Sequence, residues 1–286
     1  MSAETAPDGI GLRGAAADGP LACVFSRAAA DNFAFLAAGC RDRWVLETFQ
    51  LRADVQNVKL AVKRRLLGTE LCEGELLSFG AWTPKQVCAL AGGEPEAEPE
   101  RVRRAVASLA AEDPGAVDAV LDRQEQELVL ELVRPSSFLT RLFAAHADVE
   151  NLRAFARVRA TGRGRAVLEQ AFLPGGEIPV CALTELLGAD RDTLVVRFRF
   201  SRYRQLVEEG AGQEASRQAF RRMERAGREV LLSWLKLARY ATFGYEPLVG
   251  YYMFRENEIT NLRQLHAAKG AGAPEAECRE LVAYVE

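Results

Sequence analysis

The sequence predicts an all-α protein made of three similar helical units. Three short segments share one order of residues: acid, apolar, polar, Asn, apolar, base. The apolar residues around each copy recur at the spacing of one helix face, and a glycine follows eleven residues after each Asn. The acid, Asn and base of the three copies are Asp54, Asn57 and Lys59, then Asp148, Asn151 and Arg153, and finally Glu258, Asn261 and Arg263.

The repeated Asn needs a physical reason, because its amide competes for backbone hydrogen bonds and disfavours a helix interior. We interpret it as a half-buried structural tie to a neighbouring helix, with the charged residues of each copy left in solvent. Two alternatives are three equivalent ligand or ion sites, and a surface that docks a partner. The glycines at 68, 162 and 272 are expected to end the three helices in the left-handed conformation.

Each copy is expected to lie on a long amphipathic helix of about 25 residues, because the match extends upstream of the Asn. A large apolar residue lies thirteen residues before each Asn (Trp44, Phe138, Leu248) and another lies eight before it (Phe49, Phe143, Met253). We expect the helices that carry the second and third copies to begin at Pro135 and Pro247, since Pro favours a first helical position.

Periodicity and capping signals place the other elements. Thr83-Pro84 begins a short helix, and Thr193–Phe200 is assigned to a helix although it alternates like a strand. The remaining predicted helices cover Arg41–Leu67, Arg101–Ala110, Pro114–Val133, Pro135–Thr161, Gln213–Tyr240, Pro247–Lys269 and Pro274–Val285.

The predicted domain boundaries follow composition. Residues 1–20 are rich in Ala, Gly and Asp and are expected to be disordered. Ala91–Glu100 is typical of a linker, and a second boundary is expected near Gly188. These signals divide the chain into domains at 21–95, 96–188 and 189–286.

Composition argues against several classes of function. A net charge of −3 gives no basic field for nucleic acid. The six cysteines are scattered without a C-x-x-C pair, and with two histidines we expect neither metal nor cofactor. The first residues do not resemble a signal peptide, and no uncharged run approaches the length of a membrane span, so a soluble chain is expected.

The histidines and a row of arginines are the remaining candidates for a functional role. His146 and His266 lack a partner motif and are interpreted as ordinary helix-face residues, so no catalytic residue is assigned. Five arginines at helical spacing form either a solvated helix face or a docking face for an acidic partner. They are Arg217, Arg221, Arg222, Arg225 and Arg228.

The third copy and its surroundings carry a resemblance to a known family. The segment Tyr245–Arg263, with its Glu-Pro pair, apolar helix and Glu-Ile-Thr-Asn-Leu-Arg, resembles the C-terminal signature of the C-type rotor subunits of V/A-type rotary ATPases (ATP synthases), which are known as d-type in eukaryotes. Other segments resemble sequences of the same family: the last segment Cys278–Val285, the turn Phe172–Ile178, and the copies of the repeat that begin at Asp54 and Asp148. The resemblance covers the chain from about Arg41 to its end.

The resemblance implies a funnel-shaped protein whose three helical domains surround a pseudo-threefold axis. It implies a non-catalytic socket on the cytoplasmic side of the membrane, which couples the central stalk to the membrane rotor ring in proton or sodium transport. Only 53 residues precede Asp54, so the first domain is expected to be abbreviated. The alternative function is a helical repeat scaffold that binds partners unrelated to a rotary ATPase.

Overall fold

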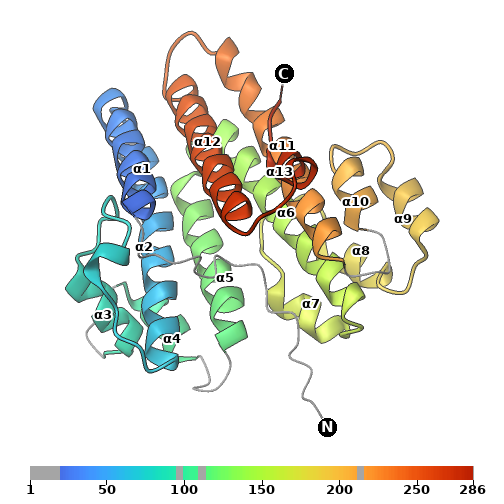
Figure 1. Cartoon of the computed structure of the whole chain (residues 1–286), viewed down its shortest axis with the longest axis horizontal. Helices are drawn as coiled ribbons and strands as arrows, with labels where there is room; N and C mark the ends of the chain where they lie inside the picture. The colour runs from blue at the N-terminus through green and yellow to red at the C-terminus, as the bar shows by residue number, and fades with distance from the viewer. Residues whose placement is uncertain (1–19, 95–98, 109–113, 211–215, 286) are drawn as a thin grey trace.

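The computed structural model describes residues 20–94, 99–108, 114–210 and 216–285, except for the side chains at 20–23, 73, 114–116 and 217. All regular structure in these residues is helical, which confirms the predicted all-α class (Figure 1). The segment expected to be disordered, 1–20, lies outside the described residues apart from the first residue of α1. The helices are α1 (Pro20–Gly39), α2 (Arg43–Leu66), α3 (Pro84–Gly92), α4 (Glu100–Ala107), α5 (Pro114–Leu132), α6 (Ser137–Ala160), α7 (Arg165–Ala171), α8 (Val180–Glu185), α9 (Arg191–Phe198), α10 (Arg204–Gly210), α11 (Arg217–Leu235), α12 (Glu246–Gly270) and α13 (Glu275–Leu281), with 3-10 turns η1 (Glu73–Glu75) and η2 (Lys236–Tyr240).

The three copies of the repeat lie on α2, α6 and α12, which have 24, 24 and 25 residues. Each of these repeat helices ends as predicted, because Gly68, Gly162 and Gly272 have φ angles of 65°, 64° and 73°. Only glycine adopts this left-handed conformation without a steric penalty. The ambiguous segment at Thr193 is also helical, in α9.

Helix starts agree with the sequence signals at Thr83-Pro84 and Pro247 and differ at Pro135. Thr83 caps α3 with a full capping box, and Pro247 is the second residue of α12. The expectation that α6 begins at Pro135 is wrong. Ser136 is the cap, and its hydroxyl accepts a hydrogen bond from the Leu139 amide at 3.0 Å, so the helix starts at Ser137.

The six longest helices form three consecutive hairpins, α1–α2, α5–α6 and α11–α12, and the second helix of each is a repeat helix. The first helix of each hairpin packs against the repeat helix of another hairpin: α5 against α2, α11 against α6, and α1 against α12. The last contact places the first and last long helices side by side (Figure 1). The packing order therefore closes on itself.

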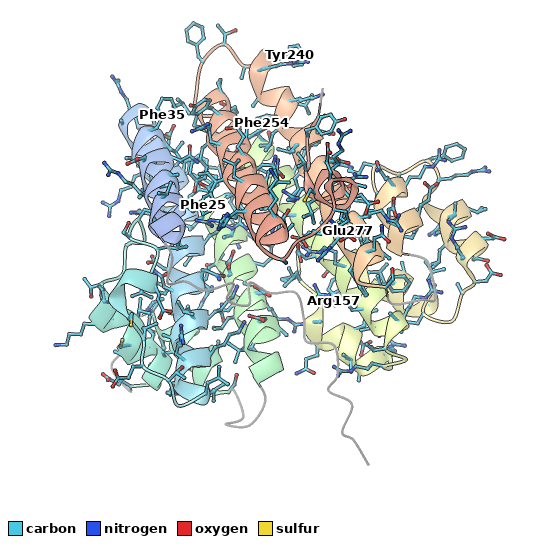
Figure 2. The ribbon with its side chains drawn as sticks, viewed as in Figure 1. Phe25, Phe35, Arg157, Tyr240, Phe254 and Glu277 are labelled. Carbon is cyan, nitrogen blue, oxygen red and sulfur yellow. The ribbon has the colours of Figure 1, made fainter. Side chains whose placement is uncertain are left out.

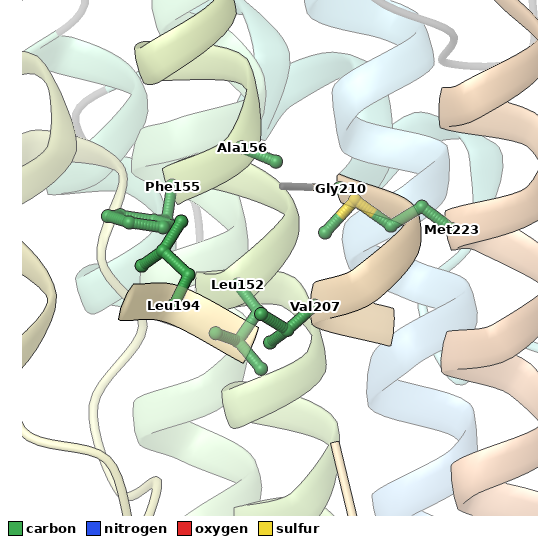
Figure 3. A pocket seen from close by; sticks show the side chains of 7 residues that line it. All are labelled: Leu152, Phe155, Ala156, Leu194, Val207, Gly210 and Met223. Carbon is green, nitrogen blue, oxygen red and sulfur yellow. The ribbon is translucent and has the colours of Figure 1, made fainter. Parts of the chain in front are cut away.

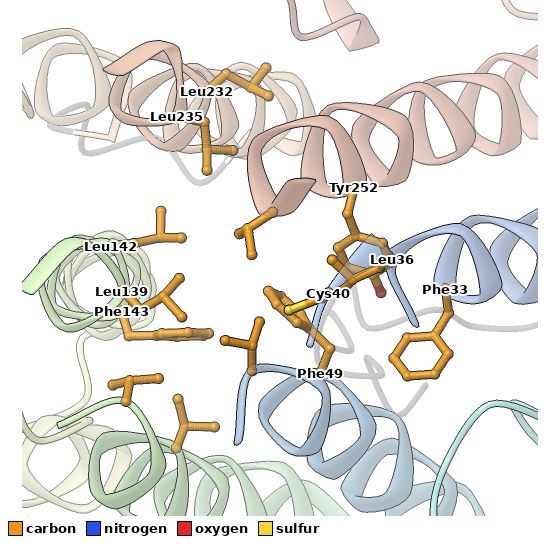
Figure 4. Close-up of a cluster of buried hydrophobic side chains, with 14 of the residues drawn as sticks. Phe33, Leu36, Cys40, Phe49, Leu139, Leu142, Phe143, Leu232, Leu235 and Tyr252 are labelled. Atoms are coloured by element: carbon orange, nitrogen blue, oxygen red, sulfur yellow. The ribbon is translucent and has the colours of Figure 1, made fainter. Parts of the chain in front are cut away.

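A common core lies at the end of the molecule where the three hairpins turn (Figure 4). It takes buried residues from all three hairpins, among them Leu36, Phe49, Phe143, Leu235 and Tyr252. The six upstream residues of the repeat all belong to or pack against it: Trp44, Phe49, Phe138, Phe143, Leu248 and Met253. The upstream match thus reflects equivalent positions in one core.

Beyond this common core, the other half of each repeat helix belongs to a separate cluster. The cluster of α2 includes residues of α3, α4 and α5, that of α6 includes residues of α7 to α11, and that of α12 includes residues of α13. The first of these clusters packs α4 and α5 against α2, although composition predicts a domain boundary between residues 95 and 96. The division into three domains and the pseudo-threefold axis stay predictions.

Candidate functional site

The three Asn side chains make the same pair of hydrogen bonds with backbone. Asn57 bonds to Leu77, Asn151 to Leu173 and Asn261 to Ala283: the side-chain amide donates to the carbonyl at 3.0, 2.9 and 2.9 Å, and the side-chain oxygen accepts from the amide at 2.8, 2.7 and 3.1 Å. The partners lie outside the helices, 20 to 22 residues later in the chain, rather than in the neighbouring helix that we expected. Each Asn side chain therefore supplies the donor and the acceptor that the backbone amide and carbonyl of a non-helical residue would otherwise lack.

The acids of copies one and two fix the same connecting segment a few residues further on. Asp54 accepts the amides of Ala81 and Trp82 at 2.9 and 3.0 Å. Asp148 accepts those of Glu177 and Ile178 at 3.1 and 3.0 Å. Both side chains are buried, at 1% and 0% exposure, which corrects the expectation that these charges remain in solvent.

In both copies the residue before the paired amides is a glycine, Gly80 or Gly176. The carboxylate of the acid lies directly against this glycine and leaves no room for a side chain there. A Cβ added at Gly80 or at Gly176 would overlap with the Oδ1 atom of Asp54 or Asp148. Burial raises the pKa of Asp54, and the hydrogen bonds from Trp82 and Ala81 offset only part of that shift. In copy two the carboxylate also accepts the Tyr203 hydroxyl at 2.7 Å, and burial together with this bond raises the pKa of Tyr203.

Copy three departs from this pattern at its acid. Glu258 is exposed and pairs with Arg255 on its own helix at 2.5 Å. An arginine supports the tie instead: Arg228 donates to Asn261 at 2.7 Å, to Asn257 at 3.1 Å, to Gln264 at 2.8 Å and to the Leu281 carbonyl at 2.6 Å. Asn257 also donates to the Ala283 carbonyl at 2.9 Å. The final segment is therefore held by a polar cluster.

The base of each copy reaches the first helix of another hairpin. Lys59 pairs with Asp122 and, at 3.3 Å, with Glu125 on α5. Arg153 lies 4.0 Å from Glu224 on α11, and Arg263 lies over the Phe25 ring of α1, 5.7 Å from its centroid. Burial lowers the pKa of Lys59, but the Glu125 and Asp122 carboxylates outweigh it and the pKa is raised. The three bases thus follow the cyclic packing order of the helices.

His146 lies in the polar interior between α2, α5 and α6. The Arg52 guanidinium lies 3.3 Å from the His146 Nε2 atom and 3.1 Å from Glu125. Burial and the Arg52 charge lower the pKa of His146 to about 4, so the ring is neutral at pH 7 and can accept from Arg52. Its Nδ1 atom has no hydrogen-bond partner among the described residues. A neutral ring held by a cation is a poor general base.

The arginines of α11 have partners within the chain. Arg221 pairs with Glu277 at 3.3 Å, Arg222 with Glu209 at 3.1 Å and Arg225 with Glu229 at 3.6 Å. Arg228 belongs to the cluster around Asn261. The side chain of Arg217 lies outside the described residues. These contacts tie α11 to α10, α12 and α13, and the docking role of the arginines stays a prediction.

Two hollows are candidates for ligand sites. The space between Leu152, Phe155, Ala156, Leu194, Val207, Gly210 and Met223 has a volume of about 10 Å³, enough for one water at most (Figure 3). A groove of about 390 Å³ lies beside Asp54 and Trp82. Its acids are already engaged, since Asp54 accepts backbone amides, Glu47 pairs with Arg43 and Glu131 with Arg101. Neither hollow presents converging polar groups to a ligand.

Within the described part of the chain, no group of three or more His, Cys, Asp or Glu residues could hold a metal ion. None of the described helices combines the length and the apolar character that crossing a membrane requires. The repeated order in the sequence pointed to the Asn residues and to the acids at 54 and 148, but it gave no sign of the contacts of Tyr203 and Asn257. For Arg228 the sequence suggested a solvated or docking role, whereas the structure places it against Asn261.

Comparison with known proteins identifies one family for this chain. A family model described as ATP synthase (C/AC39) subunit matches residues 24–281, which is most of the chain. No match was found among curated proteins. The matched range includes all three copies of the repeat and the three hairpins from Val24 onward.

Proposed function

Because the chain belongs to the ATP synthase (C/AC39) subunit family of V/A-type enzymes, we propose that it is a non-catalytic rotor subunit. It forms a socket that holds the central stalk on the membrane rotor ring. In this place it passes torque between ATP chemistry and proton or sodium movement without performing either. We place it on the cytoplasmic side, peripheral to the membrane through the ring.

The observation that carries this proposal is the cyclic packing of the three hairpins. Each repeat helix contacts the first helix of another hairpin, and the pair α1 and α12 joins segments 220 residues apart through the bond from Asn32 to the Tyr252 carbonyl. A closed set of three equivalent contacts supports three domains around a pseudo-threefold axis. Such a closed set also resists twisting better than an open array, as a torque-bearing part requires.

The chemistry of the interior supports a structural role. The buried acids at 54 and 148 accept backbone amides, and the buried base Lys59 is paired with two carboxylates. Polar groups used in this way hold segments in place and are not available to a substrate. The motif residues are therefore proposed as ties that maintain the shape of the socket.

Co-purification tests this function. A tagged chain expressed in its host is expected to bring down both the stalk subunits and the membrane ring subunit after mild detergent extraction. The variant Leu36→Asp places a charge in the common core next to the α1–α12 contact, and it should reduce the recovery of both the stalk subunits and the ring subunit. Circular dichroism of this variant serves as the control for its helix content.

The rival function is a general helical scaffold. Recovery of other proteins with neither ring nor stalk subunits would reject the rotor proposal and favour the scaffold.

A further inference from the structure

The turns of the three hairpins lie together at one end of the molecule, which we call the hairpin end and define by residues 39–43, 133–141 and 236–246 (Figure 1). Buried residues beside all three turns share the common core: Cys40, Val133 and Leu235. The three turns are therefore fixed relative to one another and present one surface.

Large apolar side chains are exposed in the third turn. Leu237, Tyr240 and Phe243 are 50%, 73% and 88% exposed, and Tyr240 lies at the hairpin end of the molecule (Figure 2). Removing large apolar side chains from water is favourable. Clustered exposure of this kind marks an interaction site.

The same end is basic although the whole chain carries a net charge of −3. The three segments hold six basic residues and two acids, Asp42 and Glu246. Among the described residues only one of the six, Arg43, forms an ion pair, with Glu47 on its own helix at 2.8 Å. Arg239 lies over the Tyr240 ring, 5.3 Å from its centroid. The basic residues are Arg41, Arg43, Arg134, Arg141, Lys236 and Arg239.

We propose that the hairpin end binds an anionic phospholipid surface, with Tyr240 and Phe243 placed among the headgroups. Aromatic side chains next to lysine and arginine are typical of protein segments at a membrane interface. The charges come from three separate turns spread over one end, which suits a continuous negative surface better than a single acidic peptide. This contact is additional to the proposed docking on the ring, since it needs no other subunit.

Vesicle co-sedimentation of the purified full-length chain tests this site without any ATPase subunit. The chain is expected to bind vesicles of mixed phosphatidylcholine and phosphatidylglycerol, and to bind pure phosphatidylcholine much more weakly. Added salt should weaken the binding. The double variant Arg134→Gln with Arg239→Gln should lower it roughly thirtyfold, because each of the two basic residues near the surface contributes about 1 kcal/mol.

Aromatic variants supply the matched control. The double variant Tyr240→Ser with Phe243→Ser should reduce binding, whereas Phe200→Ser should not. Phe200 is a suitable control because it is also 88% exposed, and the Arg199 guanidinium lies over its ring, 4.3 Å from the centroid. It lies between α9 and α10, away from the hairpin end.

Three results would overturn the proposal: no preference for anionic vesicles, equal binding by the Tyr240/Phe243 variant, or binding to polyglutamate but not to vesicles. The last result would assign the surface to an acidic protein. The vesicle assay contains no ring or stalk subunit. A negative result would therefore reject the lipid-binding site without rejecting the rotor function, which co-purification tests independently.

Discussion

Asn151 and Leu173 exchange two hydrogen bonds, at 2.9 and 2.7 Å, between a helix interior and a connecting segment. Asn151 is fully buried, so Asn151→Leu would leave the Leu173 amide and carbonyl without partners in a place that water does not reach. We expect a loss of about 2–4 kcal/mol in the free energy of unfolding, measured by urea denaturation.

The three Asn residues should differ in a defined order. Asn261→Leu should loosen the last segment but cost less than Asn151→Leu, because Asn257 also donates to the Ala283 carbonyl. Combining Asn261→Leu with Asn257→Leu should then cost more than the sum of the single changes. An unchanged thermal stability of Asn261→Leu would show that this Asn is not a structural tie.

The pair formed by Lys59 and the acids of α5 should be important for stability. Lys59 is 6% exposed, and Lys59→Met would leave Asp122 without that cation and Glu125 with Arg52 as its remaining cationic partner. We expect a loss of about 1.5–3 kcal/mol, the usual contribution of hydrogen bonds to charged groups.

Lys63 is the matched control for this prediction. It lies one turn further on the same helix and pairs with Asp118 on α5 at 2.7 Å, but about a third of its side chain is exposed. Lys63→Met should therefore cost less than about 1 kcal/mol. Equal losses for the two variants in chemical denaturation would refute the assignment of Lys59 as a buried tie.

The glycine next to the Asp148 carboxylate should not tolerate a side chain. Gly176→Ala would place a methyl group against the Asp148 Oδ1 atom, and we expect a loss of about 1–3 kcal/mol. At Gly188 an added Cβ meets open space, so Gly188→Ala should change stability by less than about 0.5 kcal/mol. Thermal melting of the two proteins makes the comparison, and similar melting temperatures would contradict it.

His146 should make stability depend on pH. Its pKa falls from 6.5 to about 4 on folding, so the folded chain favours the neutral ring. This contribution is complete above pH 6.5 and is lost as the pH falls toward 4, because the unfolded chain binds the proton first. We expect a loss on the order of 2–3 kcal/mol across this range in urea titrations, and a flatter profile for His146→Gln. Identical profiles would exclude His146 as the cause.

The repeat helices could be predicted because their signals are local. Apolar spacing, the Asn and the terminal glycine all lie within one helix, and α2, α6 and α12 appear where these signals placed them. The start of α6 was misplaced because Pro135 and Ser136 are both good signals, and the hydroxyl of Ser136 decides the cap.

The contacts that build the candidate site could not be predicted in the same way. The amides that Asp54 accepts lie 27 and 28 residues away, and nothing in the local pattern distinguishes a buried acid from a solvated one. Gly80 and Gly176 were a usable signal, since both precede the paired amides at similar spacing. Arg228 had the appearance of a surface charge, and only the fold brings it to Asn261.

Ion transport in membranes that lack the chain tests whether the chain couples the stalk to the ring. ATP hydrolysis and ATP-driven ion uptake would be measured together in sealed membrane vesicles from the host with the chain deleted. If the chain is the coupling part, uptake is lost while the catalytic head still hydrolyses ATP, and adding back the purified chain restores uptake. Unchanged ATP-driven uptake without the chain would contradict this coupling role.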